Sequence, residues 1–172
     1  MTTTSETRDE PVVGATQKVQ FIEAMGHVPT PVAIATTLEA GMPHGTTVSA
    51  FFSLSVEPPK FLLSLDQNSK LLEVVNRTRS IGLNVLDSAQ GGLARRFASK
   101  LADRFDETPW SVESGVPRLD GAAVWLSGKV DRIVAAGDHF LVLVDATAVS
   151  ARRDADPLTY RLRQLGTHRP VS

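Results

Sequence analysis

Small and hydroxyl-bearing residues gather in the segment "GTTVSA", residues 45–50. Its centre leaves backbone amides accessible to a flat ring and consists of Thr46, Thr47, Val48 and Ser49. A ring system that gains negative charge on reduction is stabilised by fixed N–H dipoles of this kind. The same residues also suit an ordinary edge strand, because β-branched residues favour strands. The chemical interpretation therefore depends on the surrounding segments.

A second group, "SLDQNSK", ends one strand-like run and begins a helical one. Ser64, Leu65 and Asp66 close the run, and Ser69 with Lys70 opens the helix. Amides at a helix N-terminus, a hydroxyl and an ammonium group together suit a phosphate. The alternative is a plain helix cap at Ser69 beside a solvated charge.

Arginine and histidine supply the remaining candidates. Arg95 and Arg104 lie in "LARRFA" and "DRF", and a guanidinium group suits pyrophosphate because it is planar and permanently charged. Both could equally be plain helix surface. His139 follows a Gly-Asp turn, whereas the other three histidines have no spacing that groups them into a metal triad. No metal site is therefore expected.

Composition limits the classes of partner. The 172 residues are enough for one domain with a sizeable core. Lys plus Arg number 18 against 19 Asp plus Glu, so nothing favours nucleic acid or an anionic membrane. Cysteine is absent, which excludes disulfides and thiolate chemistry. With no signal-peptide core and no long apolar run, we expect a soluble, cytoplasmic protein.

The periodicity of apolar residues predicts mostly strands. A short amphipathic helix is expected over residues 18–25 with its apolar face on the barrel, followed by a three-stranded meander over residues 32–37, 45–54 and 60–65. Helices should begin at Ser69 and at Asp87, and a loop is expected around residues 109–117. Residues 122–150 predict a long hairpin that turns at Gly137-Asp138. The absence of G-x-G-x-x-G and of a phosphate loop argues against a doubly wound nucleotide fold.

Several short words stand in a characteristic order: "VPTPVAIATT", "PHGTTVSAFFSLSVEPP", "FLLSLDQNSK", "GLNVL", "LARRFA", "DRF", "LDGA" and "AGDHFLVLVDATAV". In this order, over about residues 20–162, the chain resembles the flavin-reductase-like family, the reductase halves of two-component monooxygenases. The resemblance implies a mainly β fold, a split β-barrel with Greek-key topology of the FMN-binding type with short flanking helices. The expected organisation is a flexible tail over 1–16, the domain over 17–165 and a C-terminal tail over 166–172.

The resemblance also implies an activity. Such a protein transfers a hydride from NADH or NADPH to FMN or FAD and supplies the reduced flavin, by diffusion, to a partner monooxygenase. A homodimer is implied, with a flavin groove near the interface and with the apolar outer face of the barrel, including Phe51, Phe52 and Trp125, covered by the partner.

Site residues follow from the same resemblance. His139 is expected to position the nicotinamide, since hydride transfer needs no general base. Flavin binding is assigned to the two segments described above and to Thr30, Pro31, Asn84, Val85, Arg95, Phe97, Arg104, Phe105, His139 and Tyr160. For Asn84, a structural role in a buried strand is the alternative.

Two positions depart from the family pattern. Pro31 replaces a common Gly, and "RLRQL" follows Tyr160 where an aromatic residue is usual. These departures keep a non-catalytic flavin-binding or electron-relay protein as one alternative. A pyridoxamine-phosphate-oxidase-like or haem-binding split barrel is the other.

Overall fold

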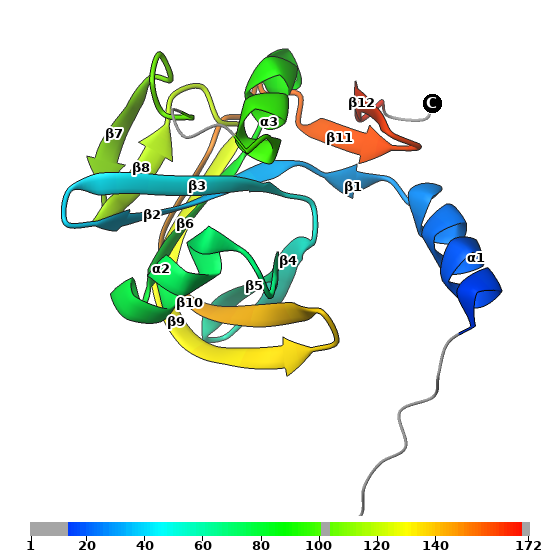
Figure 1. Ribbon diagram of the computed structural model, residues 1–172. Helices are drawn as coiled ribbons and strands as arrows, with labels where there is room; N and C mark the ends of the chain where they lie inside the picture. Colours follow the sequence, from blue (N-terminus) through cyan, green and yellow to red (C-terminus); the bar gives the residue numbers. More distant parts are fainter. Residues whose placement is uncertain (1–13, 101–103, 170–172) are drawn as a thin grey trace, which may run out of the picture.

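A curled, antiparallel seven-stranded sheet forms the body of the computed structural model, which describes residues 14–100 and 104–169 (Figure 1). The order of its strands is β3-β2-β6-β9-β10-β5-β4. Their bounds are β2 Ala33–Glu39, β3 Met42–Val48, β4 Phe51–Val56, β5 Pro59–Asp66, β6 Ser80–Val85, β9 Val124–Ala136 and β10 His139–Ala151. The long hairpin of β9 and β10 turns at Gly137-Asp138, as the sequence predicted.

The link between β3 and β4 makes the sheet curl. These two strands form its opposite edges, which would lie roughly 29 Å apart in a flat sheet with strands about 4.8 Å apart. From Val48 to Phe51, however, the chain can span at most about 11 Å. The edges are therefore brought together, and a split remains between them. The expected meander was wrong: residues 45–54 form two strands, interrupted at exposed Ser49 and Ala50.

Two helices cover the sheet. α2 (Lys70–Thr78) buries its apolar residues in the cluster that fills the curl, together with residues such as Ala33 and Leu63. α3 (Gly91–Ala98) packs Phe97 on the opposite side of β2, against Ile34. The irregular first turn expected after Asp87 is a 3-10 turn over Ser88–Gln90, capped by the Asp87 carboxylate. The alternation along β2 thus separates two clusters.

α1 (Ala15–Gly26) differs from these helices because none of its residues is buried. Its side chains Val19, Phe21, Ile22 and Met25 are all about half exposed or more. The expectation that this apolar face lies on the barrel was wrong; the helix stands off the side of the body (Figure 1). No helix in the described part of the chain is long and apolar enough to cross a membrane.

Smaller sheets complete the fold. β1 (Thr30–Pro31) pairs with β11 (Leu158–Arg161), which forms a hairpin with β12 (Gln164–Thr167). β7 (Trp110–Glu113) and β8 (Val116–Leu119) form another hairpin where a loop was expected. Trp125, expected on the outer face, is only 1% exposed. It is covered by Arg118 of β8, whose guanidinium carbon lies over the ring at 5.2 Å from the ring centroid.

The chain makes several two-residue turns. Three of them have positive φ at both central residues, and two of these place glycine second: Ala40-Gly41 and Ser114-Gly115. In the third, between β11 and β12, the central residues are Leu162 and Arg163, with φ of 50° and 62°. A non-glycine residue in this left-handed region costs about 1 to 2 kcal/mol. The β11–β12 turn is therefore the least favourable of the three.

The ends of the domain extend slightly beyond the expected boundaries. α1 begins at Ala15 rather than after residue 16, and β12 runs to Thr167 rather than ending by 165. Most of the expected N-terminal tail and the last three residues of the C-terminal tail lie outside the described residues.

Candidate functional site

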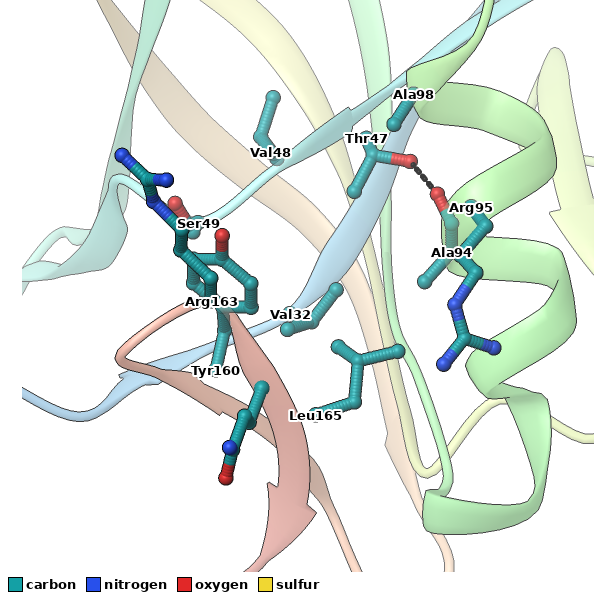
Figure 2. A pocket seen from close by; sticks show the side chains of 11 residues that line it. Val32, Thr47, Val48, Ser49, Ala94, Arg95, Ala98, Tyr160, Arg163 and Leu165 are labelled. Carbon is teal, nitrogen blue, oxygen red and sulfur yellow. Dashed lines mark hydrogen bonds between the residues drawn. The ribbon is translucent and has the colours of Figure 1, made fainter. Parts of the chain in front are cut away.

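A pocket of about 560 Å³ lies between the end of β3, helix α3 and the β11–β12 hairpin (Figure 2). This volume suits a nucleotide-sized ligand. Its lining combines apolar side chains with hydroxyls and two guanidinium groups: Val32, Thr47, Val48, Ser49, Ala94, Arg95, Ala98, Tyr160, Arg163, Gln164 and Leu165. Five of these, Thr47, Val48, Ser49, Arg95 and Tyr160, were predicted from the sequence.

The backbone of β3 borders this pocket. Because β3 is an edge strand, alternate amides point away from β2 and remain open to a ligand. Thr47 Oγ1 donates a 2.7 Å hydrogen bond to the Ala94 carbonyl oxygen, which fixes α3 against the strand. Thr46, the neighbouring residue, alternates to the other face and does not line the pocket.

The electrostatics of the pocket come from Arg95 and Arg163. In Figure 2 the two side chains stand on opposite sides of the pocket, Arg95 on α3 and Arg163 on the hairpin. Neither forms a hydrogen bond or ion pair with any residue in the described ranges, and no carboxylate is among the lining residues. By contrast, Arg77 and Arg118 each pair with a carboxylate at 2.7 Å. The pocket therefore attracts anions.

The predicted phosphate segment lies next to this pocket. The Ser64 N–H donates to the Ala50 carbonyl oxygen at 2.9 Å, so the end of β5 is beside the chain that leaves Ser49. Asp66 accepts from the Asn68 amide at 2.7 Å, while Ser69 precedes α2 without capping it through its hydroxyl. Lys70 is exposed and makes no ion pair within the described residues. The hydroxyl of Ser69 is thus not occupied by a helix cap, while Leu65 is buried in the core.

His139 lies at the same end of the sheet. It is the register partner of Asp66 and therefore neighbours the predicted phosphate segment rather than the pocket. Its Nδ1 is 2.7 Å from Asp138 Oδ1, and this hydrogen bond lowers the pKa of the Asp138 carboxyl.

Comparison with known proteins places the chain in a family. The family profile described as "Flavin reductase like domain" matches residues 25–168. The chain belongs to the flavin reductase like family. An NADH:FMN oxidoreductase from Rhodococcus qingshengii is 33% identical over 167 residues, which are 90% of this chain and 87% of the relative.

Two further relatives of this flavin reductase like domain are components of monooxygenase systems. The reductase component of 4-nitrophenol 4-monooxygenase/4-nitrocatechol 2-monooxygenase from Rhodococcus opacus is 30% identical, over 87% of this chain and 80% of the relative. The solved nitrilotriacetate monooxygenase component B from Mycobacterium thermoresistibile is 26% identical, with a TM-score of 0.86 over 91% of this chain and 89% of the other. The mainly β fold class is confirmed.

The lining fits the flavin that the family implies. Val32, Val48 and Leu165 offer apolar surface, the edge of β3 offers amides, and the arginines offer charge for a phosphate. In the described ranges no group of three or more His, Asp or Glu side chains could hold a metal ion.

Several residues expected to contact the flavin are buried within the fold of this family member. Asn84 is fully buried, where Nδ2 donates to the Ile34 carbonyl oxygen at 3.2 Å and Oδ1 accepts from the Leu119 amide at 2.8 Å. Val85 and Phe97 belong to the two core clusters. Their placement therefore does not support contact with a ring.

Arg104 and Phe105 also serve packing. Arg104 Nη1 donates to the Gly45 carbonyl oxygen at 2.9 Å, and Phe105 meets Phe97 edge-to-face at 4.9 Å between centroids. A Cβ on Gly45 would come within 2.9 Å of Phe97, so this glycine makes room for an aromatic side chain rather than for a ligand.

Thr30 and Pro31 stand beside the pocket without lining it. They pair with Tyr160 and Thr159 in the small sheet, and Thr30 Oγ1 donates to the Tyr160 carbonyl oxygen at 3.4 Å. Pro31, which has no backbone amide to donate, is outside the lining of the pocket.

Sequence reasoning missed six of the eleven lining residues. The missed residues are Val32, Ala94, Ala98, Arg163, Gln164 and Leu165. A signal did exist for three of them, because "RLRQL" was recognised as a departure after Tyr160. This segment was not recognised as a turn, because it contains no glycine or asparagine.

Proposed function

We propose that this chain is an NAD(P)H-dependent flavin reductase that transfers a hydride from a nicotinamide nucleotide to FMN or FAD. The observation that carries the proposal is the anion-attracting pocket at the open edge of β3, on a chain that belongs to the flavin reductase like family. Steady consumption of NADH or NADPH on addition of free flavin tests it. A purified protein that binds flavin but consumes neither nucleotide contradicts it.

Each part of the site has a proposed task. A bound flavin supplies a ring that accepts the hydride. Open amides at the end of β3 donate to the polar edge of that ring, where charge develops on reduction. Val32 and Val48 exclude water from one side of the ring. Ser69 and Lys70 receive the phosphate of the flavin at the start of α2.

The phosphate assignment has its own test. Replacing Ser69 and Lys70 together by alanine should weaken FMN binding by about 1 to 3 kcal/mol, the range for hydrogen bonds to charged groups. Lumiflavin lacks the phosphate and is the matched control, so its affinity should not change. Equal FMN affinity in the variant and the wild type would place the phosphate elsewhere.

His139 is proposed to position the nicotinamide from the turn between β9 and β10. His139→Ala should raise the KM for the nucleotide or slow hydride transfer about 10-fold, equivalent to about 1.4 kcal/mol, with flavin affinity nearly unchanged. If the variant only melts at a lower temperature and reacts normally, His139 stabilises the turn and takes no part in the site.

We also propose a homodimer. The exposed apolar side chains of α1 and those of β4, including Phe52 at 57% and Val56 at 89% exposure, form surface that a second copy would cover. Sedimentation at micromolar concentration tests this association. A monomer with full reductase activity would exclude a required dimer.

The reduced flavin is proposed to pass to a partner monooxygenase by diffusion. The relatives in monooxygenase systems support such a partner. Product formation by the oxygenase when a dialysis membrane separates the two proteins tests diffusion. Product formation only on direct mixing would favour transfer within a complex.

A non-catalytic role finds no support. This alternative rested on Pro31 and on the segment after Tyr160. Pro31 does not line the pocket, whereas Tyr160 does.

A further inference from the structure

Helix α3 forms one wall of the pocket, yet its own sequence stabilises it poorly. It has only 8 residues, begins with Gly91 and Gly92, and has no side-chain cap at its N-terminus. Isolated helices of this length are unstable in water, and only proline is a poorer helix former than glycine. Contacts with the rest of the protein must therefore set the position of this wall.

Apolar packing supplies part of these contacts. Phe97 is fully buried and Ala94 is 4% exposed, and both belong to the cluster that contains Ile34 of β2. Apolar burial is not directional, so it presses the helix onto the sheet without fixing where the helix lies along a strand. A hydrogen bond has a preferred distance and angle, and it can fix that position.

A side-chain hydrogen bond of this kind joins the helix to β3. Thr47 Oγ1 lies 2.7 Å from the Ala94 carbonyl oxygen (Figure 2). A carbonyl oxygen can only accept, so the one proton of the hydroxyl is committed to this bond. The Thr47 hydroxyl is therefore not available as a donor to a ligand.

This hydrogen bond connects two walls of the pocket. On the strand side, Thr47 is followed by Val48 and Ser49. On the helix side, Ala94 is followed by Arg95, and all five residues line the pocket. The separation of the two walls and the place of the Arg95 side chain thus depend on the same bond.

We propose that Thr47 is a positioning residue of the reductase site. Its hydroxyl holds α3 against β3 and so keeps the two walls at the separation that a bound flavin needs. Sequence analysis assigned Thr47 to flavin binding, whereas the structure engages its hydroxyl with the helix. This inference deepens the proposed function and rests on it, because a flavin is the ligand that senses the position of the walls.

Replacing Thr47 by valine keeps nearly the same shape and removes the hydroxyl. Without the hydrogen bond α3 should open more often, so the amides of residues 95–98 should exchange with deuterium about 10-fold faster in the ligand-free protein. The dissociation constant of FMN should rise about 10-fold, because the free energy of ordering the wall then opposes binding. Thr47→Ser retains a hydroxyl on a freer side chain and should restore both values to within about threefold of the wild type.

Thr37→Val is the matched control. Thr37 Oγ1 donates to the Ser80 carbonyl oxygen at 2.8 Å, a bond of the same kind that lies outside the pocket. Because Thr37 is fully buried, this variant should lower the melting temperature at least as much as Thr47→Val. Its dissociation constant for FMN should stay within about twofold of the wild type. Equal weakening of FMN binding by both variants would show that general stability is responsible and would refute the positioning role.

The two measurements on Thr47→Val separate the alternatives. Weaker FMN binding with unchanged exchange of α3 would mean that the hydroxyl contacts the flavin directly. Faster exchange with unchanged FMN affinity would mean that the position of α3 does not matter to the ligand. Either result refutes the proposal, as does no change in both. A wild-type protein that neither binds nor reduces flavin contradicts the proposed function instead, while exchange in the ligand-free protein still reports whether Thr47 holds the helix.

Discussion

Replacing Asn84 by alanine should destabilise the fold and leave flavin binding intact. The side chain is fully buried, and its Oδ1 is the acceptor for the Leu119 amide at 2.8 Å. Truncation leaves that amide without a partner, which costs about 1 to 3 kcal/mol. The Ile34 carbonyl oxygen and Thr36 Oγ1 also lose the Nδ2 donor, which lies 3.2 Å from each of them. The total decrease in the free energy of unfolding should be about 2 to 4 kcal/mol.

Urea denaturation followed by circular dichroism measures this decrease, and quenching of flavin fluorescence measures the affinity. Asn76 is a suitable control because it is exposed on α2, and Asn76→Ala should change stability by no more than about 0.5 kcal/mol. If Asn84→Ala keeps the stability of the wild type but binds FMN more weakly, Asn84 contacts the ring and the structural interpretation is wrong.

Three further predictions concern the scaffold of the site. Gly45→Ala should lower stability by about 1 to 3 kcal/mol, because the new Cβ would be 2.9 Å from Phe97 Cε1; an unchanged melting temperature would show that Phe97 can move aside. Asp87→Ala removes the carboxylate cap of the turn before α3 and should cost about 1 kcal/mol in urea denaturation, with no loss if water replaces the cap. Lys60 Nζ donates a hydrogen bond to Asp131 Oδ2 at 2.9 Å, which lowers the pKa of the Asp131 carboxyl below 3.8. The stability that this pair contributes is therefore present above pH 3.8 and is lost as the pH falls through the lowered pKa of Asp131 in the folded protein. Lys60→Met should therefore lose less stability than the wild type between neutral pH and about pH 3, and parallel losses would contradict this.

Local turn chemistry made much of the fold predictable. Gly137-Asp138 indicated the β9–β10 hairpin, and Asp87 indicated the capped turn that leads into α3. In both places a few adjacent residues determine the backbone. Tyr160 and residues 47–49 were predicted as pocket residues because the resemblance to the family implied them.

Long-range placement was not predictable in this way. Nothing in residues 45–54 indicates that the chain leaves one edge of a sheet and joins the other at Ser49 and Ala50. Arg163 was missed because its turn has two bulky residues at positive φ and lacks the central glycine or asparagine that indicates such a turn. Asn84 could have faced a ring or a neighbouring strand, and only the tertiary structure brings Leu119 to it.

Hydrogen bonds tether the β11–β12 turn to the end of α1. They connect this exposed helix with one wall of the pocket. The Leu162 amide and Arg161 Nε bind carbonyl oxygens at Gly26 and His27, and α1 buries no side chain of its own in the barrel. A surface that covers α1 therefore also restrains the turn that carries Arg163. Because Tyr160 and Gln164 beside this turn line the pocket, a ligand that orders the turn and a surface that covers α1 would act on the same hydrogen bonds.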